Sequence, residues 1–215
     1  MLSVFSKINF ILFFFISLLF LNFHVQSQTI QTPKSNLEIM DSLAKSSAST
    51  LLNFISEKKI SSVNLSIAQH DASWLFLNAF SLLQNSKNIS VYSVLSNKKE
   101  ECPNDLNIAI INIETRYFNI EENRDSLQRE SFLHLESFLK SKNTGKIESL
   151  PPIKLVYKDK IPRENADRLN NKSYQFANAS IPEEQKTFWE EVGVPFILVS
   201  SAIITVVLLF TVRSK

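Results

Sequence analysis

The C-terminal end of the chain most restricts what this protein can be. From Val194 to Val212, nineteen residues carry no formal charge, and Arg213 and Lys215 follow directly. A helix of about 1.5 Å per residue spans about 28 Å over that run, close to the thickness of the hydrocarbon core of a bilayer. A buried core helix is the alternative, but such a helix normally carries a polar stripe. The sequence therefore predicts a transmembrane helix over residues 194–212 and a short tail at residues 213–215.

A second apolar segment lies at the N-terminus. Lys7 precedes an apolar run over residues 8–23, and the residues that end at Ser27 fit a signal-peptidase site. We predict a signal peptide over residues 1–27, with Gln28 as the first mature residue. An uncleaved anchor is the alternative, because the run is long for a signal peptide. No cysteine follows the run, so lipoprotein processing is not available to this chain.

The charges on the two sides of the predicted transmembrane helix indicate its orientation. Arg213 and Lys215 follow the helix, and Lys and Arg favour the cytoplasmic side of a membrane. The export signal places the middle of the chain outside the cytoplasm independently. The Phe- and Asn-rich signal peptide suggests a bacterium. We therefore predict a single-pass protein of the bacterial inner membrane whose domain faces the periplasm.

Composition excludes several classes of function. The formal net charge is +2 and the charges are interspersed, so we predict no nucleic-acid partner. Gly145 and Gly193 are the two glycines, which excludes Gly-rich phosphate loops. Cys102 is the one cysteine, so no internal disulfide forms; its thiol is either buried or available to a partner. We expect no cofactor.

The middle of the chain alternates between helical and extended patterns. Residues 28–36 read as a flexible lead, and Asn36 is the expected N-cap of a first helix. Asp71 is the expected N-cap of a second helix. The apolar spacing predicts, in chain order, a helix over residues 37–58, a strand over 60–67, a helix over 71–84, a strand over 89–95 and a strand over 106–120.

The strand over residues 106–120 is apolar almost without alternation between Ile108 and Ile113, which predicts a central strand buried on both faces. Residues 131–140 fit either a strand or a helix. We favour the strand, because Asn143-Thr144-Gly145 forms a good turn back into residues 146–150. A short extended piece follows at residues 153–157.

These elements define the expected domain. Residues 37–157 form an exported α+β domain, α/β-like in its alternation, with helices packed on a mixed sheet. Residues 158–193 are polar, Asn-rich and poorly periodic. We interpret them as a tether, or a loosely packed cover, that leads to the membrane.

The side chains that carry chemistry do not gather into a site. His70-Asp71, near Ser73, is the one His-carboxylate neighbour pair of the domain, and adjacent residues seldom form a catalytic dyad. His134 has no metal-ligand spacing to another residue, and Trp74 is expected in the core. We therefore predict no catalytic, cofactor-binding or metal residues. Solvated loop carboxylates are expected at Glu100, Glu101, Asp105, Glu121, Glu122 and Asp125.

The order of elements carries a resemblance. A helix at residues 43–55 leads to a strand at 62–67, a helix at 72–83 leads to a strand at 89–94, and a later strand ends in the Thr144-Gly145 turn. This order resembles a family of bacterial envelope proteins: the exported domains of the curli-secretion channel, the FlgO-type flagellar protein, the LpoB-type activator of cell-wall synthases and the TolB N-terminal domain. The resemblance covers residues 37–157 and implies a binding or assembly role without a shared catalytic site. The predicted C-terminal membrane helix departs from that family.

Three functional hypotheses follow. The first is a noncatalytic membrane-anchored envelope protein whose domain binds or helps to assemble another envelope component, or associates with itself. The second is a membrane-tethered hydrolase that uses His70 and a nearby Ser or carboxylate. The third is a small subunit of a membrane complex that assembles through its transmembrane helix, where Ser200, Ser201 and Ala202 form a small-residue patch.

Overall fold

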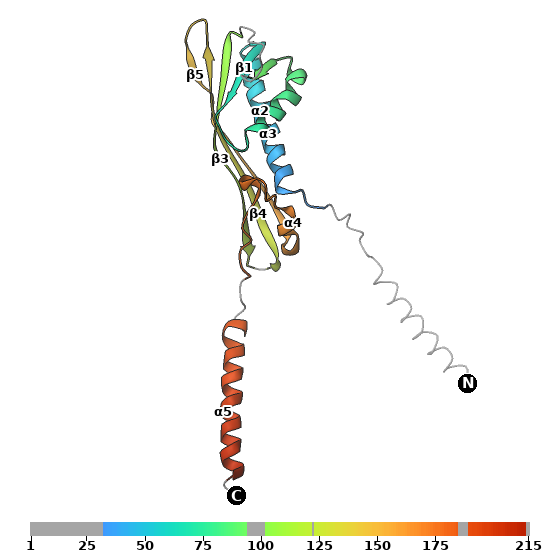
Figure 1. The fold of residues 1–215 in the computed structure, drawn as a ribbon, viewed down its shortest axis with the longest axis vertical. Coiled ribbons are helices and arrows are strands. Elements are labelled where there is room, and N and C mark those ends of the chain that lie inside the picture. The colour runs from blue at the N-terminus through green and yellow to red at the C-terminus, as the bar shows by residue number, and fades with distance from the viewer. Residues whose placement is uncertain (1–31, 94–101, 122, 185–188, 214–215) are drawn as a thin grey trace, which may run out of the picture. The chain divides into compact units, whose positions relative to one another are not determined.

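The computed structural model describes residues 32–93, 102–121, 123–184 and 189–213 (Figure 1). The predicted signal peptide, residues 28–31 of the lead, Glu100, Glu101 and Glu122 lie outside these residues. The chain divides into two compact units, Met1–Thr32 and Pro33–Lys215, and the description below concerns the second.

The helices and strands of this unit follow the predicted order and add several elements near the end. The α-helices are α2 (Asn36–Glu57), α3 (Ser73–Leu83), α4 (Ala166–Leu169) and α5 (Val194–Arg213). The strands are β1 (Ser62–Ile67), β2 (Ser90–Ser93), β3 (Asn104–Ile120), β4 (Asn123–Ser141), β5 (Ile147–Ser149) and β6 (Ile153–Pro162). Short helical turns are η1 (Gln84–Lys87), η2 (Arg163–Asn165), η3 (Gln175–Ala177) and η4 (Trp189–Gly193).

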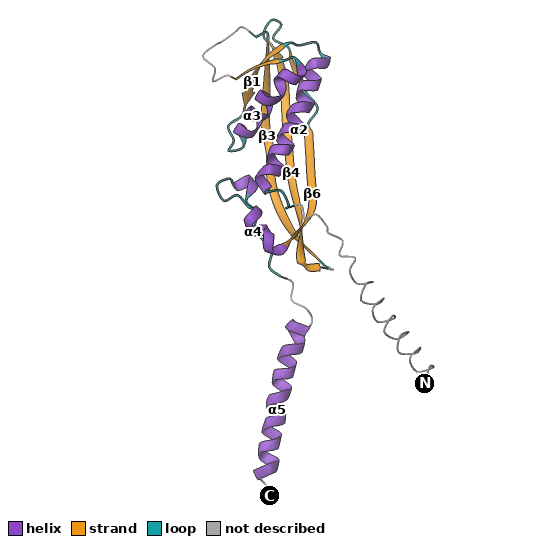
Figure 2. Ribbon diagram, turned by 90° about the vertical axis from the view of Figure 1, so that its right-hand side faces the viewer, coloured by secondary structure: helices purple, strands orange, loops and turns teal. Residues whose placement is uncertain are grey.

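The strands form one mixed sheet of six strands in the order β2-β1-β3-β4-β5, with β6 also paired to β4. Strand β1 is parallel to β2 and β3, and the pairs that involve β4 are antiparallel. Helices α2 and α3 lie together over one face of the sheet (Figure 2). The predicted α+β fold, with helices on a mixed sheet, is confirmed.

The core lies between these two helices and the sheet. Alternate residues of β4 point into it, because successive side chains of a strand face opposite sides. Each fully buried Leu, Ile or Phe side chain contributes roughly 1.5–3 kcal/mol relative to an exposed one. The fully buried side chains include Met40, Leu51, Ile55, Leu75, Phe76, Phe80, Leu106 and Leu133.

Strands β3 and β4 form a long antiparallel hairpin. Its structure confirms one prediction and contradicts another. Residues 131–140 form part of β4, as the turn signal indicated, and Gly145 in that turn has a φ of +69°. Ile111, however, is 51% exposed, beside a register shift between Ile110 and Asn112. The prediction that this strand is buried on both faces is wrong, because the helices cover one face only.

Neither of the two residues predicted as N-caps, Asn36 and Asp71, caps its helix. The N-cap of α2 is Ser35, whose hydroxyl accepts from the Glu38 amide at 3.3 Å, while the Glu38 carboxylate accepts from the Ser35 amide at 2.6 Å. Asn36 is instead buried in the first turn. At α3, the Asp71 side chain does not cap the helix; the ring Nδ1 of His70 accepts from the Ala72 amide at 3.0 Å.

We expect replacement of Ser35 by alanine to lower the free energy of unfolding by about 1 kcal/mol, because the Glu38 amide loses its acceptor and the Glu38 carboxylate loses the hydroxyl donor. The hydrogen bonds from Ser35 hold the pKa of Glu38 below its usual value of 4.5. The stabilisation is therefore present above pH 4.5 and is lost as the pH falls through the lowered pKa. Urea unfolding of both proteins between pH 3 and 7 measures it. An equal difference at every pH would contradict this account.

The structure differs most from the predicted organisation at residues 158–193, which are predicted to form a tether. Strand β6 continues to Pro162, and the segment after it packs against the hairpin and α2. The assignment of residues 158–193 to a tether is therefore wrong for residues 158–179, because residues 158–162 are the end of β6 and residues 163–179 form a packed cover of the domain. The buried residues of this segment are Ile161, Ala166, Leu169, Phe176, Ala177 and Ala179.

Helix α5 covers the predicted membrane segment. In the part of the chain that the structure describes, one helix is long and apolar enough to cross a membrane, with a mean hydropathy of 2.6 over Glu191–Phe210. Only 6% of that stretch is buried inside the protein, so α5 is not a core helix. The transmembrane assignment of residues 194–212 remains a prediction.

Candidate functional site

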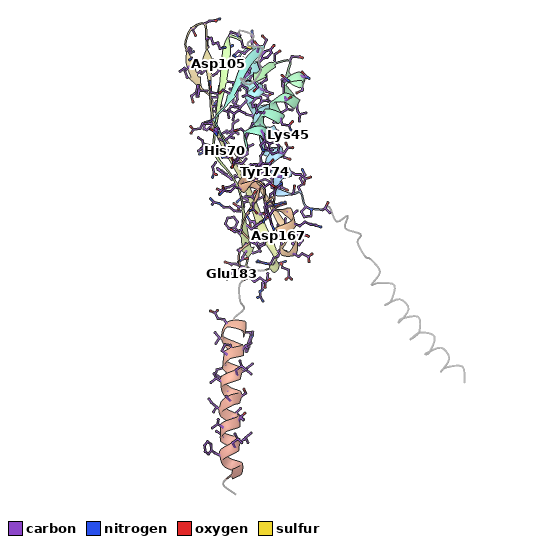
Figure 3. The ribbon with its side chains drawn as sticks, viewed as in Figure 1. Lys45, His70, Asp105, Asp167, Tyr174 and Glu183 are labelled. Atoms are coloured by element: carbon purple, nitrogen blue, oxygen red, sulfur yellow. The ribbon has the colours of Figure 1, made fainter. Side chains whose placement is uncertain are left out.

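Two of the residues singled out from the sequence, His70 and Asp71, line a groove along strand β3. Strand β1 pairs with the first residues of β3 only, and the chain then turns away at Ala68. Further along β3, a hollow with a volume of about 370 Å³ opens beside residues 112–115. We call it the β3-edge groove; its lining residues are His70, Asp71, Asn112, Ile113, Glu114, Thr115, Gln175, Phe176 and Asn178. In Figure 3, His70 lies at mid-height of the domain, between Asp105 and Asp167.

The groove brings His70 and Asp71 to one end but does not assemble a catalytic pair from them. The Nδ1 atom of His70 accepts from the Ala72 amide, so the proton of the neutral ring is on Nε2 and the ring offers a donor to the groove. The Ser73 hydroxyl donates to the Ala68 carbonyl at 3.1 Å. His70 therefore does not activate Ser73, and this geometry gives the hydrolase hypothesis no support.

The charged side chains that line the groove are both acidic. The Glu114 carboxylate accepts from the Arg116 guanidinium at 2.7 Å and from the Asn112 amide group at 2.9 Å. Asp71, in contrast, has no hydrogen-bond or ion-pair partner among the described residues. The groove thus presents a free carboxylate at the end where β1 departs.

An aromatic row fixes the segment that forms the other wall of the groove. The Trp74 and Tyr174 rings have centroids 5.3 Å apart, and the Tyr174 and Phe176 rings stack at 5.4 Å. Phe176 is buried, whereas Trp74, predicted in the core, is 39% exposed. The row joins α3 to η3 and so holds Gln175 and Asn178 in place beside β3.

A buried polar cluster lies further along the hairpin. The Arg129 side chain is 0% exposed and forms a bidentate pair with Asp159, with distances of 2.8 Å from Nε and 2.6 Å from Nη2. Its Nη1 donates to the Lys34 carbonyl at 2.7 Å and to Asn36 Oδ1 at 2.9 Å. Alternate residues of β4 are buried, and Arg129 takes one of these inward positions between Leu127 and Leu133. An arginine at an inward position is the sequence feature that could have predicted this cluster.

Asn36 and Tyr117 extend the cluster to the C-terminal cover. The Asn36 amide group donates to Tyr117 at 3.0 Å, to Asn170 at 2.8 Å and to the Ala177 carbonyl at 3.2 Å. Burial raises the pKa of Tyr117 above its usual value of 10.0, so its hydroxyl stays protonated and donates. The cluster is a structural junction of α2, the hairpin, β6 and the cover.

The sheet face opposite the helices carries a mixture of apolar and paired charged side chains. Lys158 donates to Glu130 at 2.6 Å, which lowers the pKa of Glu130, and Arg116 pairs with Glu114. We call this surface the open face. The large apolar side chains exposed on it or at its margin are Ile111, Phe118, Phe138, Ile147 and Val156.

Other residues considered in the sequence analysis lie outside the groove. Cys102 is buried. Asp105, predicted in a loop, lies in β3 and accepts from Asn64 at 3.0 Å and from Lys142 at 3.3 Å. His134 is half-buried in β4, and its Nε2 has no partner within the described residues. In the described ranges, no group of three or more His, Cys, Asp or Glu side chains could hold a metal ion.

Comparison with known proteins gives limited information. No protein-family model and no curated protein sequence matches the chain. Among solved structures, a minor lipoprotein of Acinetobacter baumannii has 7% identity and a TM-score of 0.31, covering 48% of this chain and 66% of its own. A lipoprotein of Neisseria meningitidis has 9% identity and a TM-score of 0.32, covering 68% of this chain and 98% of its own.

Both structures are described as bacterial lipoproteins, which are envelope proteins, and neither is described as a member of the curli-secretion, FlgO, LpoB or TolB groups. These neighbours agree with the expected likeness to bacterial envelope proteins in general. They do not support the four groups named in the sequence analysis. At these TM-scores the likeness carries no argument about fold or function.

Proposed function

We propose that this chain is a noncatalytic, membrane-anchored protein of the bacterial cell envelope, whose domain binds or helps to assemble another envelope protein. The observation that carries the proposal is the open face of the sheet. A six-stranded sheet with helices on one face leaves its other face available, and here that face exposes several large apolar side chains. Clustered exposed apolar side chains mark interaction surfaces in soluble domains.

The charges on the open face also suit a protein partner. Glu130 of β4 and Lys158 of β6 are already paired across the strands, and Glu114 and Arg116 are paired along β3. A partner that covers such pairs leaves each charge with its hydrogen-bond partner, which limits the cost of removing water from it. Val156 lies among these pairs and is 52% exposed. It offers an apolar contact at their centre.

Helix α5 supports the anchoring part of the proposal. Its apolar side chains from Val194 to Phe210 are exposed along the helix, and such a surface is stable only against lipid or another apolar surface. The preceding residues include exposed Glu183 and Glu191, on the side where the domain lies in the sequence. This order agrees with a domain outside the cytoplasm and a short basic cytoplasmic tail.

Crosslinking in intact cells, followed by mass spectrometry, tests the proposal. We expect the tagged full-length chain to capture a defined envelope protein, and Val156→Glu to reduce that capture by roughly tenfold, the effect of losing about 1.4 kcal/mol of binding energy. The new carboxylate lies between Lys154 and Lys158, which face the same side of β6, so the melting temperature should not change.

Leu82→Glu is the matched control, because Leu82 is an exposed apolar residue of α3, away from the open face. It should leave capture intact. Capture of no envelope protein would refute the proposal. Capture that survives Val156→Glu but is lost when α5 is exchanged for an unrelated membrane helix would instead support assembly through the transmembrane segment.

A further inference from the structure

Within the part of the chain that the structure describes, one edge of strand β3 has no partner strand along the β3-edge groove. The last contact with β1 is the hydrogen bond from the Ala68 amide to the Ile108 carbonyl at 2.8 Å. Strand β3 continues to Ile120, paired on its other side with β4. Among the described residues, no backbone hydrogen bond reaches the outer edge of β3 between residues 112 and 118.

The pairing pattern identifies the backbone groups on this edge. The Ser137 carbonyl accepts from the Leu150 amide, on the side of β4 away from β3. The backbone N–H and C=O groups of odd-numbered β4 residues therefore point away from β3, and those of even-numbered residues point toward it. The register pairs even-numbered residues 128–134 of β4 with even-numbered residues 112–118 of β3. The amides and carbonyls of Ile113, Thr115 and Tyr117 therefore point outward, away from β4.

These three residues are held firmly. Their side chains are buried on the helix-covered face, where Thr115 contacts Ser131 at 3.2 Å and Tyr117 belongs to the polar cluster. The outward backbone groups are thus presented in fixed positions at the spacing of a strand. Unpaired strand edges of this kind readily pair with another chain.

Two other edges of the sheet, at β2 and β6, carry features that discourage pairing with another strand. On β2, the Val91 amide donates to the side-chain oxygen of Gln84 at 3.0 Å. On β6, Lys154, Lys158 and Lys160 provide the charged side chains that typically prevent edge pairing. The β3 edge between Ile113 and Tyr117 carries no lysine or proline and opens into a groove.

We propose that the β3-edge groove binds an extended segment of a partner polypeptide as an added strand beside residues 113–117, with a basic side chain of that segment on Asp71. The proposal rests on the proposed function and names the partner's chemistry. The added strand occupies the sheet position that β1 vacates at Ala68. Backbone hydrogen bonds provide affinity, and the side-chain contacts provide selectivity.

The charges of the groove select among possible occupants. Among the described residues Asp71 has no hydrogen-bond or ion-pair partner, whereas Glu114, the other charged residue in the lining, is paired with Arg116. A Lys or Arg in the added strand therefore gains an ion pair with Asp71. A second copy of this chain presents Arg116 on the same edge, but its guanidinium is already paired with Glu114, so it is not free to pair with Asp71. The groove therefore fits a basic extended segment of another protein.

The test uses the full-length chain in detergent micelles and a labelled six-residue peptide, acetyl-Thr-Val-Lys-Val-Thr-Val-amide, as the probe. Fluorescence anisotropy measures binding, and amide hydrogen exchange locates it. We expect exchange at Ile113, Thr115 and Tyr117 to slow by roughly tenfold, because these outward amides gain acceptors. The amides of Asn112 and Glu114 should change little, since they already face β4.

Two changes in the probe separate backbone pairing from charge. Exchange of its lysine for glutamate should weaken binding by roughly tenfold through loss of the Asp71 contact. Methylation of alternate backbone amides in the peptide should abolish binding in one of the two methylation registers, because the hydrogen bonds to β3 need those donors. Equal binding of all these peptides would overturn the proposal.

Protein variants give the reciprocal test. Thr115→Pro removes one outward amide without removing a hydrogen bond to β4, and binding should be lost. Asp71→Asn should remove the preference for lysine over glutamate, whereas the matched control Asp167→Asn, an exposed carboxylate of α4, should retain it. Should Thr115→Pro fail to fold, the methylated peptides on the unmodified chain still decide the question.

Crosslinking in cells distinguishes failure of this inference from failure of the proposed function. A photo-reactive residue at Gln175, on the rim of the groove, should capture the same envelope protein that the full chain captures. A partner captured from the open face at Val156 but never from Gln175, with no peptide binding, refutes the strand-addition site and leaves the function intact. Capture from neither position refutes the proposed function.

Discussion

Replacement of Arg129 by alanine is expected to lower the free energy of unfolding by about 3–5 kcal/mol, the cost of breaking a buried ion pair on one side. The substitution leaves the Asp159 carboxylate, the Lys34 carbonyl and Asn36 Oδ1 without the donors that the guanidinium provides. Urea unfolding followed by circular dichroism measures the change. The matched control is Arg116→Ala at an exposed pair, which should cost less than about 1 kcal/mol.

The double substitution Arg129→Met with Asp159→Leu should recover much of this loss. Apolar residues of similar volume restore packing and remove the unpaired carboxylate, and such exchanges are often neutral or stabilising by about 1–4 kcal/mol. Recovery here remains partial, because the Lys34 carbonyl still loses its donor and Asn36 Oδ1 keeps only the Tyr117 hydroxyl. A single variant as stable as the unmodified chain would show that Arg129 is not the centre of the junction.

A chain that ends at Tyr157 is expected not to fold, whereas a chain that ends at Glu184 folds and is recovered in the soluble fraction. The shorter chain lacks Asp159, which leaves Arg129 without its ion-pair partner, and it lacks the cover, which includes the buried Phe176. Loss of a buried phenylalanine alone costs about 3–5 kcal/mol, which is comparable to the whole stability of many small domains.

Cell fractionation and circular dichroism of both truncated chains measure this difference. The full chain serves as the membrane-associated reference. Equal folding of the two truncated chains would restore the tether interpretation of residues 158–193. Retention of the chain ending at Glu184 in the membrane fraction would contradict the single-anchor topology, because that chain lacks α5.

The elements predicted correctly are those whose pattern is local. Helix α2 repeats apolar residues at three- and four-residue steps, and β4 alternates over most of its length, so each period is visible in sequence. The turn at Gly145 was also predictable, because a positive φ favours glycine. The choice of strand over helix for residues 131–140 depended on this turn.

The features that the sequence did not reveal depend on contacts between distant segments. The cover at residues 163–179 reads as polar because its asparagines are numerous, yet Asn170 accepts hydrogen bonds from Asn36 and from the Ala179 amide in the folded chain. No window of sequence shows those partners. A buried arginine on the inward face of β4 was the one local sign that a polar cluster existed.

The candidate site was predictable only in part. His70 and Asp71 were recognised as neighbours at the end of a strand, and they do line the groove. The free edge of β3 was not foreseen, because it depends on how far β1 accompanies β3. Strand length is visible in sequence, but the register of two parallel strands is fixed by packing against α2 and α3.

The polar junction also has a consequence for the timing of folding. Asn36, in the first turn of the domain, bonds to Asn170 and Ala177, which lie 134 and 141 residues further along the chain. Contacts of such separation form late, because the intervening chain must first be brought together. In a chain that crosses a membrane N-terminus first, residues 170–177 emerge only shortly before residues 194–212 arrive. The domain would therefore reach its final structure only when the predicted membrane segment has entered the translocation channel.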